Sequence, residues 1–140
     1  MLIRAVLTKD PEVIRPDASI REAAKKMKQL DIGMLPVCDG ERLIGAVTDR
    51  DMAIRALAEG LDANRTFVHQ VMSRVPFYCF EDDDVELAAI IMEEKQVRRL
   101  PVLNRQKRLV GIISLGDLAV ETGDDLMAGE ALEAISCPSR

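Results

Sequence analysis

The sequence predicts a mixed α/β fold (α+β in layout) made of two β-α-β-β-α repeats packed with pseudo-twofold symmetry. Sliding the 140-residue chain by 65 residues aligns Pro36 with Pro101. The second copy has one extra residue near Gln106, so the offset after it is 66, which aligns Gly45 with Gly111. The matching positions gather at turns and at apolar residues. A unit of roughly 55 residues buries too little surface to be comfortably stable alone, so two such units are expected to pack together.

Each repeat is predicted to begin with a short extended piece followed by a helix. Ser19 and Glu22 form a capping-box signature, and apolar residues recur at helical spacing after it. In the second repeat Asp84 is the expected N-cap. We expect the extended pieces at residues 13–14 and 78–80 and the helices at 19–30 and 84–95.

A hairpin and a second helix complete each repeat. Two extended runs flank a polar turn in both copies, which is typical of a hairpin. The runs are expected at 34–37 with 43–48 and at 100–103 with 109–114, and the closing helices at 50–59 and 116–123. The predicted organisation is therefore a first repeat over residues 1–65, including the N-terminal segment and the linker, a second repeat over 66–123, and an acidic tail over 124–140. An apolar stripe in the tail predicts a short helix that packs on a dimer partner or on the module itself.

Composition argues against several classes of protein. The net charge is −5, with one Tyr, three Phe and no Trp, so neither a basic nor an aromatic surface for nucleic acid is expected. No apolar run suits a membrane span, and the N-terminus lacks the pattern of a secretory signal. Three cysteines without a C-x-x-C pair and a single histidine argue against a metal site and against a nucleophilic enzyme. We interpret the cysteines as reduced thiols of a cytoplasmic protein.

One motif closes the hairpin of each repeat: a glycine, two apolar residues, Ser or Thr, two variable residues and then Asp. Its polar residues are Thr48 and Asp51 in the first repeat and Ser114 and Asp117 in the second. Three residues separate hydroxyl and carboxylate, so both can face one point near a helix N-terminus, where an anionic group is favoured. The same spacing also suits a plain N-cap, which is the structural alternative.

Together with the paired L-P-V segments, this doubled motif resembles a CBS-domain pair (Bateman module), and most closely the small stand-alone bacterial kind. The resemblance implies that Asp51 and Asp117 bind a ribose, with Thr48 and Ser114 near a phosphate. Basic residues next to these positions are candidate phosphate contacts, namely Arg50, Arg98 and Arg99. The adenine is expected against the extended pieces or the segments around the two prolines, namely Val13, Tyr78, Met34, Pro36 and Pro101.

Two alternatives stay open for the arginines and the sites. Arg98 and Arg99 could instead be surface charges paired with Glu93 or Glu94. The resemblance also implies composite sites that draw on both halves, so the sequence does not assign each arginine to a site. The run Asp82-Asp83-Asp84 precedes a helix, where acids are favoured electrostatically, and we do not interpret it as a metal site.

The sequence therefore predicts a regulatory binding module rather than an enzyme. The expected ligand is an adenosine nucleotide (AMP, ADP or ATP), with S-adenosylmethionine or NAD as less favoured choices. Binding is expected to change the relative setting of the two halves, which requires unequal affinity for two arrangements. A homodimer through the helices and an unknown protein target are the expected partners, with neither nucleic acid nor membrane. The alternative is a structural dimerising adaptor that binds no ligand.

Overall fold

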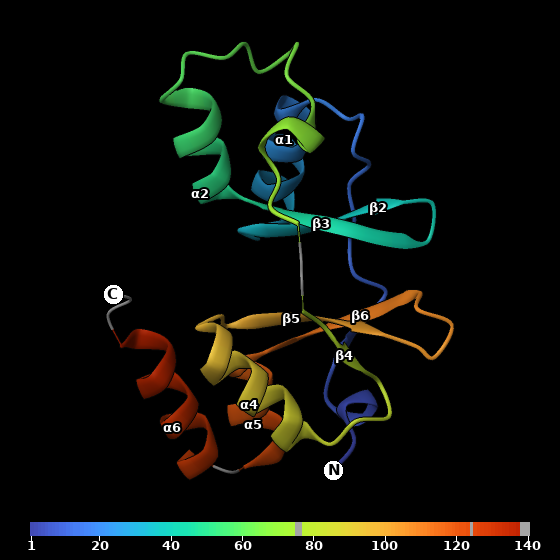
Figure 1. Ribbon diagram of the computed structural model, residues 1–140, viewed down its shortest axis with the longest axis vertical. Helices are drawn as coiled ribbons and strands as arrows, with labels where there is room; N and C mark the ends of the chain where they lie inside the picture. The colour runs from blue at the N-terminus through green and yellow to red at the C-terminus, as the bar shows by residue number, and fades with distance from the viewer. Residues whose placement is uncertain (75–76, 124, 138–140) are drawn as a thin grey trace. The chain divides into compact units, whose positions relative to one another are not determined.

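A computed structural model describes residues 1–74, 77–123 and 125–137 of the chain. The chain forms two compact units (Figure 1). The first-repeat unit is Glu12–Pro76, and the second-repeat unit joins Met1–Pro11 to Phe77–Arg140. Both units combine helices with paired strands, which confirms the predicted mixed α+β class.

A hairpin forms the sheet of the first-repeat unit. Strands β2 (Met34–Asp39) and β3 (Arg42–Thr48) pair antiparallel, as predicted. The extended piece expected at residues 13–14 is reduced to one parallel bridge between Ile14 and Val37. On the other side of the hairpin, an antiparallel bridge joins Ala46 of β3 to Ser73.

The helices of the first-repeat unit pack around this hairpin. Helix α1 spans Ile20–Leu30, as expected for 19–30. The helix expected at 50–59 is a short α2 (Asp49–Met52) that continues as the π-helix η2 (Ala53–Leu57). A further turn of helix, α3 (Val68–Val71), comes before Ser73. The core of this unit consists of apolar side chains from α1, both strands, η2 and α3.

The second-repeat unit repeats this plan with a four-stranded sheet. The strand order is β1-β6-β5-β4, with β4 parallel to β5 and the other pairs antiparallel. Its strands are β1 (Thr8–Lys9), β4 (Cys79–Phe80), β5 (Arg99–Leu103) and β6 (Leu109–Ser114). Its helices are the 3-10 helix η1 (Ile3–Ala5), α4 (Val85–Lys95), α5 (Leu115–Thr122) and α6 (Asp125–Ser136).

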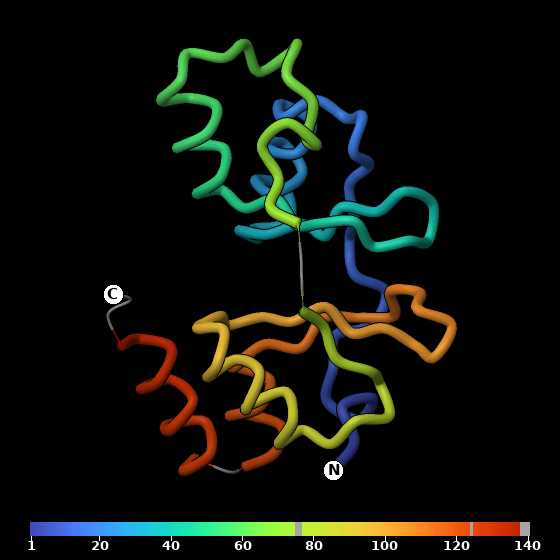
Figure 2. The backbone as a smooth tube through the Cα atoms, in the orientation of Figure 1, coloured from blue at the N-terminus to red at the C-terminus, as the bar shows by residue number. Residues whose placement is uncertain are grey.

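The opening segments of the two repeats are exchanged between the units. β1 belongs by sequence to the first repeat but pairs with β6, while Ser73, its counterpart 65 positions later, pairs with β3. Figure 2 shows the blue N-terminal segment lying among the yellow-to-red segments of its own unit. Residues 1–11 therefore belong to the second-repeat unit and residues 66–74 to the first-repeat unit, and each segment adds a strand or bridge to the sheet of the opposite repeat. Each segment covers an edge of a hairpin that would otherwise be unpaired.

This exchange explains the glycine that opens each motif. A Cβ atom on Gly45 would lie 2.7 Å from the carbonyl oxygen of Ser73, and one on Gly111 would lie 2.6 Å from that of Thr8. Both contacts are with backbone, which cannot rotate away. Glycine is needed at these positions because another strand approaches too closely for a side chain.

The first helices of the two repeats differ in what covers them. α1 and α4 begin at the predicted caps, with Ser19 accepting from the backbone of Glu22 at 3.1 Å and Asp84 accepting from that of Glu86 at 2.9 Å. α1 buries one face only, whereas α4 is apolar over more of its surface and has the partly buried Ile91 packed against the core. The additional cover over α4 comes from α6.

The predicted tail helix is present and packs on its own unit. α6 lies against α4 and α5, with Ala128 and Ala131 buried and Met127 and Ile135 against the core. The side-chain amide of Gln96 donates to the carbonyl of Cys137 at 2.8 Å and ties the helix end to α4. Of the two alternatives for the tail, packing on the module is the one observed. Among the described residues, no helix has the length and apolar character needed to cross a bilayer.

Candidate ligand-binding site

The motif of the first repeat forms a capping box where β3 passes into α2. The backbone N–H of Asp51 donates to the Thr48 hydroxyl, and the N–H of Thr48 donates to Oδ2 of Asp51, both at 3.0 Å. The Asp51 side chain is only 13% exposed, and its Oδ1 lies 3.8 Å from the Arg55 guanidinium. The carboxylate is therefore held in one orientation at the helix start, with its second oxygen next to a cation.

The second repeat reproduces this geometry where β6 passes into α5. Asp117 donates its N–H to the Ser114 hydroxyl at 3.0 Å, and Ser114 donates its N–H to Oδ2 of Asp117 at 2.9 Å. Over the described residues, Oδ1 of Asp117 has no hydrogen-bonding or ionic partner. Both motifs thus perform the capping role that sequence reasoning offered as the alternative. Each cap uses only Oδ2, and Oδ1 lies beside Arg55 in the first repeat and has no partner among the described residues in the second, so capping and ligand binding are compatible.

The strand beside each motif carries different chemistry in the two repeats. Met34 pairs with Thr48 in the register of the first hairpin, and Arg99 pairs with Ser114 in the second. The carbonyl of Arg98 also accepts from the N–H of Leu115 at 2.8 Å, which joins the residue before β5 to the start of α5. The hydroxyl of the second repeat therefore lies beside two arginines, whereas the hydroxyl of the first repeat lies beside a half-buried methionine.

The predicted arginines are exposed. Within residues 1–74, 77–123 and 125–137, Arg98 and Arg99 have no ion-pair partner, so the proposed pairs with Glu93 or Glu94 are not observed. Arg50 is also exposed, in the first turn of α2.

Arg55 was missed by sequence reasoning. Its guanidinium donates to the carbonyl of Val71 at 3.0 Å and to the Ser73 hydroxyl at 3.1 Å, and it lies beside Asp51. It therefore ties the exchanged segment of the first-repeat unit to η2 and to the motif. The available signal was its spacing four residues after Asp51 on one helix face.

The residues predicted to contact adenine lie next to each other within each unit. The N–H of Ile14, which follows the half-buried Val13, donates to the carbonyl of the buried Pro36 at 3.0 Å. Cys79, which follows the half-buried Tyr78, donates its thiol to the carbonyl of the buried Pro101 at 3.8 Å. These backbone and thiol hydrogen bonds bring the two segments together within each unit, while their contact with adenine stays a prediction.

An edge-to-face contact holds the Tyr78 ring against Phe80, with ring centroids 5.4 Å apart. The Arg105 guanidinium stacks on the Phe80 ring 4.1 Å from its centre, and it also pairs with Asp82 at 2.8 Å. This pairing lowers the pKa of Asp82 below its usual value.

The acidic run at 82–84 has structural roles, since Asp84 caps α4. No three His, Cys, Asp or Glu side chains in the described part of the chain gather as a metal site.

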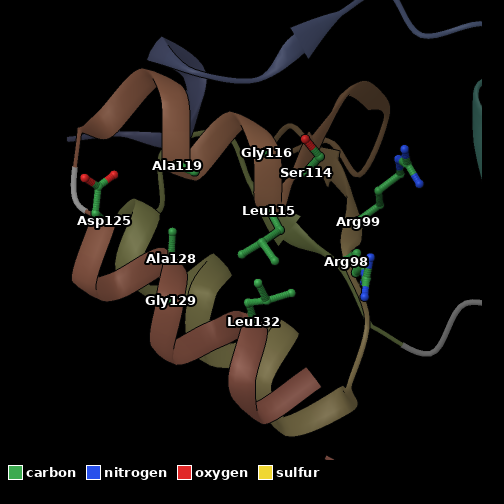
Figure 3. Close-up of a pocket in the computed structure, with 10 residues that line it drawn as sticks. All are labelled: Arg98, Arg99, Ser114, Leu115, Gly116, Ala119, Asp125, Ala128, Gly129 and Leu132. Carbon is green, nitrogen blue, oxygen red and sulfur yellow. The ribbon is translucent and has the colours of Figure 1, made fainter. Parts of the chain in front are cut away.

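A cleft of about 530 Å³ lies between α5 and α6, within the second-repeat unit (Figure 3). It begins at Arg98, Arg99 and Ser114, so three predicted ligand residues line it. Asp117 is not among its lining residues. The remaining lining residues come from the two helices: Leu115, Gly116, Ala119, Asp125, Ala128, Gly129 and Leu132.

The repeated units and their motifs match a known family. The CBS domain family matches the sequence twice, over residues 3–57 and 68–122. The chain belongs to the CBS domain family. Both matches end with the helix that follows the motif, so α6 lies outside the CBS domains.

Relatives of similar length are known among CBS domain proteins. The chain is 40% identical over 134 residues to the CBS domain-containing protein YhcV of Bacillus subtilis, covering 96% of this chain and 94% of that protein. It is also 40% identical over 102 residues to Hypoxic response protein 1 of Mycobacterium tuberculosis, covering 72% and 71%.

Solved CBS structures share the fold. A crystal structure of Hypoxic Response Protein I with two coordinated zinc ions superposes with a TM-score of 0.78 at 35% identity, covering 85% of this chain and 97% of that one. The CBS domain pair of protein MJ0100, in complex with 5-methylthioadenosine and S-adenosyl-L-methionine, superposes with a TM-score of 0.75 at 31% identity, covering 88% and 96%.

Proposed function

We propose that this CBS pair is a regulatory module that binds an adenosyl ligand, with AMP, ADP or ATP as first candidates and S-adenosylmethionine as the next. The observation that carries the proposal is the capping box found in both repeats. Each box leaves one carboxylate oxygen outside the cap at a helix start, and this oxygen faces Arg55 in the first repeat and has no partner among the described residues in the second. The MJ0100 pair, crystallised with two adenosyl compounds, supports the ligand class.

Different residues of each unit would contact the ribose, the phosphate and the adenine of the ligand. Oδ1 of Asp51 or Asp117 can accept hydrogen bonds from ribose hydroxyls while Oδ2 keeps its capping bond. Thr48 and Ser114 would lie near the first phosphate. The phosphate contacts of the second repeat would come from Arg98 and Arg99, since guanidinium groups suit bidentate phosphate binding, and Arg50 is the candidate of the first. Adenine would lie against Val13, Tyr78, Met34, Pro36 and Pro101.

A thermal-shift panel with AMP, ADP, ATP, S-adenosylmethionine and 5-methylthioadenosine tests the proposal. A ligand at a hundredfold excess over its Kd should stabilise the protein by about 2.7 kcal/mol, which raises the Tm by several degrees. The double variant Asp51→Ala with Asp117→Ala should lose this shift. The control is Asp84→Ala, which removes an aspartate cap outside both motifs and should keep the shift. A double variant that responds like the native protein would exclude these carboxylates as ribose ligands.

A dimerising adaptor is the second candidate, because the capping boxes alone account for all four motif residues. Exposed apolar side chains on η2, with Leu57 at 79% and Ile54 at 48% exposure, offer a surface for a second copy. An adaptor predicts no shift with any compound of the panel and a dimer that survives the double Asp variant in sedimentation analysis.

The proposed module is regulatory rather than catalytic. Its output would pass to an unidentified protein target in the cytoplasm, through a change in the setting of its halves. A steady-state ATP hydrolysis assay checks the catalytic alternative, and turnover above the buffer rate would contradict the proposal.

A further inference from the structure

The cleft between α5 and α6 is built partly outside the CBS domains. One wall is α5, inside the second family match, and the other is α6, which begins three residues after that match ends. The first-repeat unit has no helix at the position that corresponds to α6, because residues 58–67 after η2 form turns and irregular backbone. The cleft is therefore a feature that the second repeat acquires from its C-terminal helix.

The two ends of the cleft carry opposite charge. Arg98 and Arg99 stand at one end, exposed and, among the described residues, without an ion-pair partner. Asp125 stands at the other end, in the first turn of α6 (Figure 3). An anionic group is attracted to the arginine end and repelled from the Asp125 end, so a bound anion has one favoured orientation.

The middle of the cleft is apolar and open. Leu115 and Leu132 point toward each other between its charged ends, with alanines from both helices alongside (Figure 3). Leu132 is 45% exposed, so apolar surface remains to be covered. A Cβ atom on Gly129 would meet no atom within 4 Å, which shows free space above the helix at this point.

We infer that this cleft binds a small molecule in which an anionic group is joined to a short apolar body. The anionic group lies at Arg98 and Arg99, and the apolar body lies between Leu115 and Leu132. The volume of about 530 Å³ is within the range of small-molecule sites. The inference shares the arginines with the proposed phosphate contacts but does not need the ribose contact, because Asp117 does not line the cleft.

Calorimetric titration with inorganic phosphate, ethyl phosphate, butyl phosphate and hexyl phosphate tests both parts of the site. Each methylene that enters the cleft should tighten binding about fourfold, until the apolar part is filled. Arg98→Gln with Arg99→Gln should abolish binding of the whole series. The matched control, Lys28→Gln with Arg42→Gln, removes two exposed charges from the other unit and should bind like the native protein.

Gly129→Leu tests the apolar part without removing any contact. The new side chain occupies the open space, so the dependence on chain length should disappear while inorganic phosphate still binds. Glu133→Leu adds the same side chain to α6 outside the lining and should keep the dependence. Hexyl phosphate binding that is no tighter than phosphate binding, or that is unchanged by Gly129→Leu, would overturn the inference.

The double Asp51→Ala, Asp117→Ala variant separates this inference from the proposed function. The variant should bind hexyl phosphate like the native protein, even where it no longer responds to nucleotides. Competition with AMP then identifies the source of the ligand. Displacement of hexyl phosphate by AMP assigns the arginine end of the cleft to the phosphate of the adenosyl ligand, and simultaneous binding assigns the cleft to a separate amphiphilic anion.

Discussion

Alanine at the motif glycines should weaken both units by separating their exchanged segments. In Gly45→Ala the new Cβ would lie 2.7 Å from the Ser73 carbonyl oxygen, and in Gly111→Ala it would lie 2.6 Å from that of Thr8. Ser73 exchanges two backbone hydrogen bonds of 2.9 Å with Ala46, which a retreating strand would lose. Two such bonds contribute about 1 kcal/mol each, and overpacking costs about 1–3 kcal/mol more. These contributions sum to a net loss of about 3–5 kcal/mol for Gly45→Ala, and we expect a loss of similar size for Gly111→Ala.

Urea unfolding followed by circular dichroism measures this loss. The control is Gly129→Ala, where the added Cβ meets no atom within 4 Å and the residue lies inside α6. Alanine has a higher helix propensity than glycine, so this variant should gain up to about 1 kcal/mol. Variants at Gly45 and Gly111 within about 0.5 kcal/mol of the native protein, the range of neutral surface changes, would refute the close approach of the exchanged segments.

Three further changes test other parts of the structure. Cys137 is exposed. Burial raises the pKa of Cys79 to about 12, with a smaller contribution from the nearby Asp83 charge. Burial also raises the pKa of Cys38. Ellman's reagent at pH 8 should therefore label one thiol in the folded protein and three in urea, and fast labelling of two would contradict the buried positions. Ser114→Ala removes a helix cap and should lower the free energy of unfolding by about 1 kcal/mol. Truncation before α6 should lower the Tm because it uncovers α4, and an unchanged Tm would show that α6 adds no stability.

Local patterns were enough to predict most of the helices and hairpins. Ser19 and Asp84 cap the helices as expected, because a cap is decided by neighbours within three residues. The hairpin strands follow from apolar runs around polar turns. The doubled motif also identified the CBS family, since its spacing repeats at matching places in the chain.

The candidate site was predictable only where its geometry is local. The hydroxyl and carboxylate of each motif meet because three residues of helix start bring them together. The contact of Arg55 with Val71 and Ser73 joins residues 16 to 18 positions apart, and no pattern in the sequence predicts this contact. The ligand roles of the motif residues remain predictions that the nucleotide panel tests.

The amino-acid sequence by itself determined the repeat, its elements and the capping boxes, because each depends on side chains close together along the chain. Tertiary structure alone decided that β1 and Ser73 complete the opposite repeat, that α6 covers α4 and α5, and that a charged and apolar cleft results. These outcomes depend on which exposed strand edge or apolar helix face is covered by which distant segment. Several segments of similar composition could cover such an edge or face, and only the folded structure shows which segment does so.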